Sequence, residues 1–132
     1  MKKKFEKYIQ ELELNEGLGS IDEFRKDHPF PEDVIEFYKY SNGAIGSIGK
    51  GYIQLWSSHE MEQMEELYMI RSIAPNLLFL GSDGGGEVYA YDKKKKCFVM
   101  YPYFGDYPND VIDIAKDFFA FIQKIYNGNN FK

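Results

Sequence analysis

The stretch from Leu77 to Asp92 limits what this chain can fold into more than any other part of the sequence. It begins with a short apolar run, Leu77–Leu80, whose length suits a buried strand. Four glycines then fall within the six residues Gly81–Gly86, and glycine reaches backbone conformations that other residues avoid. The run Val88–Tyr91 is again rich in residues that favour strands. The pattern therefore predicts a strand, a tight glycine turn and a second strand.

This glycine turn does not match a phosphate-binding loop. Its three consecutive glycines fit neither GxGxxG nor GxxxxGK[ST], and the segment that follows alternates like a strand rather than a helix. Asp83 and Glu87 flank the glycines and would repel an anion. The residues assigned to a structural turn are Gly81, Gly84, Gly85 and Gly86. Valine at either of the last two is expected to cost about 1–3 kcal/mol through backbone strain. The alternative is a site where another molecule approaches the bare backbone.

Composition and charge narrow the class of protein. A chain of 132 residues suits one domain, expected to span residues 1–132. A net charge of −5 argues against direct binding of nucleic acid and is compatible with a basic protein partner. The single cysteine, Cys97, excludes an internal disulfide and favours a reducing compartment. Because no apolar run approaches the roughly 20 residues of a membrane helix, we expect a cytoplasmic protein with no membrane contact.

The remaining patterns predict helices at both ends of the chain and strands between them. Apolar spacing and capping residues predict helices over 4–14, from Ser20 to about Lys26, from Pro31 to Asn42, after Ser57 and from Val111 to Ile125. Alternation predicts strands over Tyr52–Trp56 and Cys97–Tyr103, and the lysines Lys93–Lys96 predict a solvated hairpin tip, with a phosphate-binding patch as the alternative. The fold class is therefore α+β, a mostly antiparallel mixed sheet flanked by helices.

No catalytic constellation stands out. Neither His28 nor His59 lies in a metal-binding or triad pattern, and most paired carboxylates fall on predicted helix surfaces. A cluster of acids near the central turn, drawn from Asp83, Glu87, Asp92 and Asp106, is the alternative, for a metal or a general acid. We predict a binding protein without enzyme activity, cofactor or metal.

Three stretches, taken in order, resemble the SUKH superfamily of bacterial immunity proteins, which also includes a yeast cell-wall assembly regulator. The first is the acidic helix that starts at Pro31 and ends at Asn42-Gly43. The second is the strand Tyr52–Trp56 entering a helix, and the third and most specific is Phe79–Asp92. The resemblance covers about residues 21–126 and implies an α+β fold without catalytic residues.

The resemblance also implies a function. It indicates an immunity protein, or antitoxin, of a polymorphic toxin system, which binds and neutralises a cognate secreted toxin stoichiometrically. We expect that toxin to be a nuclease whose basic surface an acidic, aromatic surface can cover. The alternatives are an intracellular scaffold or regulatory binding module on the same fold and, further off, an enzyme or small-ligand binder that uses the glycine turn. The sequence leaves the oligomeric state open.

The best candidates for the partner surface are acids and aromatics near the predicted turn, strand faces and late loop. They are Trp56, Asp83, Glu87, Tyr89, Asp106 and Tyr107. Tyrosine and tryptophan dominate binding energies where they are buried by a partner. The alternative is that the aromatics pack at the edge of the core and the acids are simply solvated.

Overall fold

The computed structural model describes residues 3–128 and residue 131. Seven strands form one sheet in these residues, and every neighbouring pair is antiparallel. The strands are β1 (Glu13–Leu14), β2 (Ala44–Ile48), β3 (Gly51–Leu55), β4 (Leu77–Ser82), β5 (Glu87–Asp92), β6 (Cys97–Pro102) and β7 (Ile112–Ala115). Their order in the sheet follows their order in the chain, so the sheet is a simple meander. This confirms the predicted α+β class.

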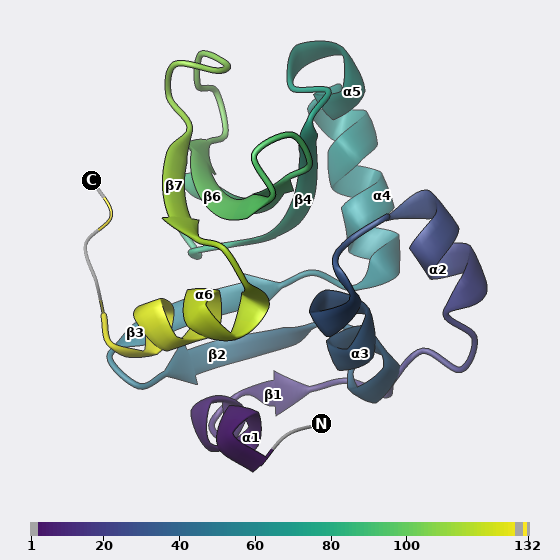
Figure 1. Cartoon of the computed structure of the whole chain (residues 1–132), viewed down its shortest axis with the longest axis vertical. Helices are drawn as coiled ribbons and strands as arrows, with labels where there is room; N and C mark the ends of the chain where they lie inside the picture. Colours follow the sequence, from purple (N-terminus) through teal and green to yellow (C-terminus); the bar gives the residue numbers. More distant parts are fainter. Residues whose placement is uncertain (1–2, 129–130, 132) are drawn as a thin grey trace.

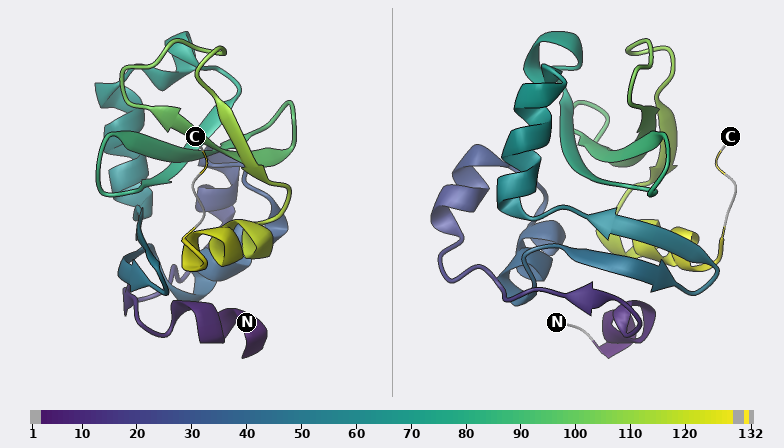
Figure 2. Two further views of the ribbon diagram at one scale, coloured as in Figure 1. Left: turned by 90° about the vertical axis from the view of Figure 1, so that its left-hand side faces the viewer. Right: turned by 180° about the vertical axis from the view of Figure 1, so that it is seen from behind.

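Helices cover parts of this sheet. They are α1 (Lys3–Ile9), α2 (Asp22–Asp27), α3 (Glu32–Tyr40), α4 (Ser58–Leu67), α5 (Ile70–Ile73) and α6 (Phe118–Tyr126). Helix α6 lies along one face of β2 and β3, with α1 and α3 beside it, whereas α4 runs beside β4 (Figures 1 and 2). Seen from behind in Figure 2 (right), the opposite face of β2 and β3 carries no helix formed by the described residues.

The sheet changes direction between β3 and β4, so that β4 to β7 curl above β2 and β3 (Figure 1). The two strands pair through Gln54 with Ser82 and through Leu55 with Gly81. A Cβ atom at Gly81 would lie 2.0 Å from the backbone oxygen of Gln54. This close approach explains a glycine inside a strand, and it supports the structural role predicted for Gly81.

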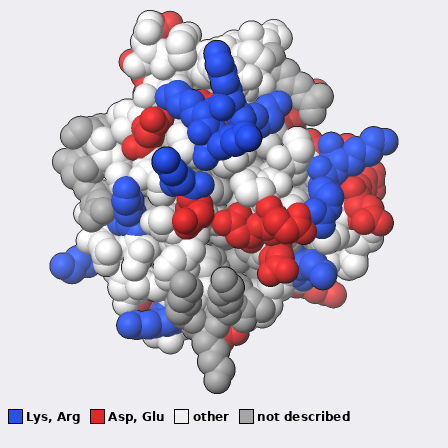
Figure 3. Space-filling model, viewed as in Figure 1, with Lys and Arg blue, Asp and Glu red and all other residues white. Residues whose placement is uncertain are grey.

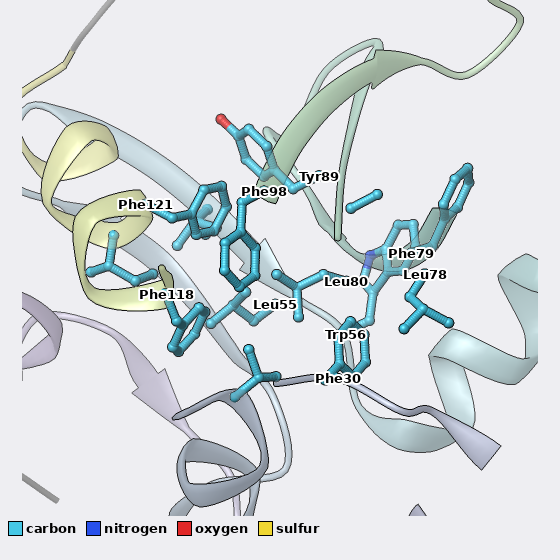
Figure 4. Packing of buried hydrophobic residues seen from close by; sticks show 14 of the residues in the cluster. Phe30, Leu55, Trp56, Leu78, Phe79, Leu80, Tyr89, Phe98, Phe118 and Phe121 are labelled. Carbon is cyan, nitrogen blue, oxygen red and sulfur yellow. The ribbon is translucent and has the colours of Figure 1, made fainter. Parts of the chain in front are cut away.

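An aromatic core fills the space under α6. Phe98 of β6 stacks on Phe121 at 5.2 Å and packs against Phe118 at 5.7 Å, measured between ring centroids (Figure 4). The amide N–H groups at the start of α6 are capped by carboxylates: Asp117 accepts from Ala120 and Asp33 accepts from Phe118. The buried stripe of α6 is therefore core, and its start is fixed by two acids.

Several predicted elements are confirmed. Helix α3 begins after Pro31 and buries Val34, Phe37 and Tyr38, as its apolar spacing indicated. The capping box between Ser57 and Glu60 is present at the start of α4. The lysines 93–96 form a tight turn between β5 and β6.

Three other predictions were wrong. The helix predicted over 4–14 ends at Ile9, since Glu13 and Leu14 pair with β2. The helix predicted from Ser20 begins only after Ile21, and it has no side-chain cap. The segment 112–115, predicted as helix, is strand β7 because it pairs with β6.

Candidate functional site

The glycine turn is held by its own side chains. The carboxylate oxygen Oδ1 of Asp83 accepts hydrogen bonds from the N–H groups of Gly85 (2.8 Å) and Glu87 (3.3 Å). The hydroxyl of Ser82 accepts one from the N–H of Gly84 (3.0 Å). Since these amide groups already have acceptors within the turn, they are not aimed at a phosphate, which agrees with the structural reading of the sequence.

The strained position in this turn is Gly84, not Gly85 or Gly86 as predicted. Gly84 has a φ of +83°, and a Cβ atom there would also lie 2.7 Å from the ring of Tyr52. Gly85 and Gly86 have no such φ, and a Cβ atom at Gly86 would meet no atom within 4 Å among the described residues. The backbone at Gly86 is therefore open to an approaching molecule.

Three of the predicted partner-binding residues, Asp83, Glu87 and Tyr89, lie together at the glycine turn. Burial raises the pKa of Tyr89 to about 12, and the nearby carboxylates of Asp83 and Glu87 add to the shift. A hollow of about 230 Å³ opens here, with Asp83, Tyr89 and the exposed ring of Tyr52 among its lining residues. Asp83 is half-buried, whereas Glu87 and Tyr89 are buried, and the Tyr89 ring packs on Phe121 at 5.1 Å (Figure 4).

Trp56 lies elsewhere, at the end of β3, and is only 5% exposed. Its ring packs 6.3 Å from that of Phe79 (Figure 4). Its carbonyl accepts a hydrogen bond of 2.5 Å from the hydroxyl of Tyr38. These contacts favour the packing alternative for Trp56, because a side chain so deeply buried offers a partner little surface.

Asp106 and Tyr107 lie in the loop between β6 and β7. Asp106 is exposed, and its carboxylate accepts a hydrogen bond from the side chain of Asn109, while its own N–H donates to Asp110. The hydroxyl of Tyr107 accepts one from the Asn76 side chain at 3.3 Å. Both residues help to fold the loop, and their role in binding a partner stays a prediction.

The sequence analysis missed the most exposed aromatic side chain, Phe104, which is 91% exposed. The ring of Tyr68, just after α4, lies 5.2 Å from that of Tyr103 and 5.8 Å from that of Phe104. We call Tyr68, Tyr103 and Phe104 the aromatic corner. With Gly85, Gly86 and Pro102 they line a hollow of about 530 Å³. The sequence signal that points to this corner is the aromatic pair Tyr103-Phe104, followed by Gly105, in an otherwise polar loop.

Backbone contacts hold the aromatic corner in place. The N–H of Tyr103 donates to the carbonyl of Gly86 (3.1 Å), which ties the loop to the glycine turn. The N–H of Gly105 donates to the carbonyl of Pro102 (3.0 Å). The hydroxyl of Tyr101 donates to the carbonyl of Gly105 (2.7 Å). Phe104 is therefore displayed at the tip of a tight, hydrogen-bonded turn.

The longest run of basic residues in the sequence, Lys93–Lys96, lies at another turn of the same meander. All four lysines are exposed, and they gather into one patch over the turn between β5 and β6 (Figure 3). Lys95 pairs with Asp113 of β7 at 3.0 Å. This arrangement fits the solvated hairpin tip that the sequence predicted.

The acids that sequence reasoning placed together do not form one cluster. The carboxylate of Asp92 caps the lysine turn, whereas Asp106 belongs to the β6–β7 loop. Within the part of the chain that the structure describes, no three histidine, cysteine or acidic residues are grouped as a metal ion would require. None of the described helices is long and apolar enough to cross a membrane.

Comparison with known proteins identifies the family. The model of the SMI1/KNR4 family (SUKH-1) matches residues 7–124. These residues include every strand of the sheet, the glycine turn and the aromatic corner. A search of curated proteins found no match. The family comprises non-catalytic immunity and regulatory proteins, and membership supports a protein-binding role of the immunity or SMI1/KNR4 kind. The chain belongs to the SMI1/KNR4 family, the SUKH-1 branch of the superfamily that its sequence motifs resemble.

Proposed function

We propose that this protein is an immunity protein that binds a cognate secreted toxin and neutralises it stoichiometrically, without turnover. The observation that carries the proposal is the SMI1/KNR4 family match over residues 7–124. The whole chain, residues 1–132, acts as one domain in the cytoplasm, where its single, buried thiol at Cys97 stays reduced.

The toxin is a nuclease domain with a basic surface. The chain itself is acidic, with a net charge of −5, and it exposes the aromatic side chains of Tyr40, Tyr52 and Phe104. A nuclease holds phosphates with cationic residues, and an acidic surface attracts the same residues over long range. Complementary charge raises the rate of association, which matters for a protein that must reach a toxin before the toxin acts.

Co-expression tests the proposal directly. The toxin domain encoded beside this gene is expressed in a bacterial host with and without this chain, and survival is scored. We expect survival only in the presence of the chain, and a 1:1 complex of the purified proteins that blocks nuclease activity in proportion to the amount of complex. If the neighbouring toxin domain kills the host equally in both cases, the proposal fails.

The regulatory branch of the family supports a second candidate, an intracellular scaffold or regulatory binding module. The two functions differ in what happens to the partner. An immunity protein abolishes the partner's activity at equimolar ratio, whereas a scaffold binds without inhibiting it, so activity of the bound partner separates them.

A further inference from the structure

We propose that the aromatic corner, Tyr68, Tyr103 and Phe104, is the surface on which a basic protein partner docks. An apolar part of the partner covers the Phe104 ring, and its lysines or arginines lie against the carboxylates around the corner. The inference rests on the proposed function and deepens it, because it names the contact surface and the chemistry of the partner.

The exposure of Phe104 indicates a binding partner, because contact with water does not stabilise an apolar ring. It is 91% exposed although phenylalanine has no polar atom, and burying it in the core would have stabilised the fold. Leu67 and Met69, on either side of Tyr68 in the chain, are exposed apolar side chains too. Exposed apolar side chains that adjoin one another are typical of an interaction site.

The backbone that carries the ring is already ordered. Its turn is closed by the hydrogen bonds of Gly105 and Tyr103 described above, and the ring lies 5.8 Å from that of Tyr68. A turn whose backbone is already ordered loses little conformational entropy when a partner covers it. Aromatic residues of this kind dominate the binding energy of protein interfaces.

Charge complementarity identifies the partner as basic. The three segments that carry the corner, residues 58–68, 83–86 and 103–111, contain no lysine or arginine, and the first basic residue after Tyr68 is Arg71 of α5. The exposed carboxylates of these segments are Glu60, Glu62, Glu66, Asp106 and Asp110, whereas Glu65 is half-buried 3.7 Å from His28 and Asp83 is half-buried in the glycine turn. Helix α4 carries the exposed Glu66 in its last turn and no basic residue there, although a helix C-terminus favours cations. The carboxylate of Glu66 therefore does not stabilise the helix dipole, and it suits a cationic partner.

The glycine turn lets the partner come close. Gly85 and Gly86 line the hollow beside Phe104, and the space around a Cβ atom at Gly86 is empty to 4 Å. A partner side chain can therefore reach the backbone there, and a single added methyl group would stand in its way. The exposed lysines of the β5–β6 turn repel the same partner from another part of the surface, which favours one orientation.

Three substitutions, each with a matched control, test the docking surface. The purified toxin domain encoded beside the gene is titrated against Phe104→Ala, Gly86→Ala and Glu66→Lys. The controls are Tyr40→Ala, another exposed aromatic on α3, Gly19→Ala, where a Cβ atom also meets nothing within 4 Å, and Glu36→Lys, an exposed acid on α3. Each variant is first shown to melt like the parent.

We expect Phe104→Ala to weaken binding about thirtyfold and Gly86→Ala about tenfold, with all three controls within about threefold of the parent. Glu66→Lys should slow association and reduce its dependence on salt. If the parent binds and inhibits the toxin but Phe104→Ala and Gly86→Ala bind equally well, the docking surface is wrong and the proposed function stands. If the parent does not bind the toxin domain at all, the proposed function fails and this inference fails with it.

Discussion

Strand β5 is flanked by two turns that are each capped by an aspartate and that present opposite surfaces. In the glycine turn, Asp83 accepts hydrogen bonds from the N–H groups of Gly85 and Glu87. In the lysine turn, Asp92 accepts them from the N–H groups of Lys94 (2.9 Å) and Lys95 (3.0 Å). An aspartate that begins a turn can cap its amides in this way whatever side chains follow.

The two turns differ in burial, in backbone and in the surface they expose. Asp92 is buried and Asp83 half-buried. The left-handed position is a glycine in one turn, Gly84 at φ +83°, and a lysine in the other, Lys96 at φ +55°. One turn exposes bare backbone beside an aromatic group, and the other exposes four cations. The comparison teaches that one capping residue supports turns of different backbone, and that the residues after it decide which surface each turn exposes.

The largest effect is expected from removing the cap of the lysine turn. Asp92→Ala should destabilise the protein by about 2–3 kcal/mol, because two amide groups lose a charged acceptor beside a buried site. Asp83→Ala should cost about 1 kcal/mol, since water can reach the half-buried glycine turn. Urea unfolding of both variants measures the difference.

Asp92→Asn provides the control, because it keeps an acceptor oxygen and should lose less than the alanine variant. A larger loss for Asp83→Ala than for Asp92→Ala would contradict the proposed difference in burial between the two turns.

The second prediction concerns the glycine with positive φ. Gly84→Val should cost about 2 kcal/mol, since valine is strained at a φ of +83° and its Cβ atom would overlap the ring of Tyr52. Thermal unfolding of Gly84→Val in the parent and in a Tyr52→Ala background separates the two causes. Strain alone predicts the same loss in both backgrounds, and overlap predicts a smaller loss without the ring.

The sequence predicted this central meander well because its signals are local. Apolar runs, a glycine cluster and a lysine tip follow one another within residues 77–103, and each strand pairs with its neighbour in the chain. The same locality explains the success at Ser57, whose capping box needs four consecutive residues.

The wrong helix predictions at both ends of the chain depend on strand pairing that local spacing does not reveal. Ile114 and Ala115 fit a helical spacing that continues into Phe118, yet pairing with β6 makes them strand. Glu13 and Leu14 likewise leave the predicted first helix to pair with β2. Local propensity cannot report such pairing.

The candidate site divides in the same way. The turn and its acids, Asp83 and Glu87, could be located from sequence, but exposure could not. Trp56 is buried and Phe104 is displayed, although both follow strand-like runs. Which aromatic faces water depends on the loop and helix packed around it, and that arrangement exists only in three dimensions.

A smaller effect, of opposite sign, is expected at the lysine turn. Lys96→Gly should stabilise the protein by up to about 1 kcal/mol, because glycine adopts a φ of +55° without the steric cost that lysine bears. Lys94→Gly, at an exposed position without positive φ, serves as the control and should not stabilise. Differential scanning calorimetry measures both, and equal shifts for the two variants would show that the backbone of Lys96 carries no strain.

The smallest effect on stability is expected at Gly86. Gly86→Val should stay within about 0.5 kcal/mol of the parent, as surface substitutions away from special backbone positions do. The sequence alone predicted strain here, but the φ of Gly86 is not in the left-handed region and the space around its Cβ position is empty.

Chemical unfolding of Gly84→Val and Gly86→Val, measured side by side, checks this prediction. The two glycines belong to one turn, but only Gly84 has the backbone conformation that requires glycine. A loss at Gly86 as large as at Gly84 would mean that the whole turn demands glycine for folding. Near-parental stability at Gly86 leaves its bare backbone without a structural reason, and it gives weight to the proposal that a partner needs the open space beside Phe104.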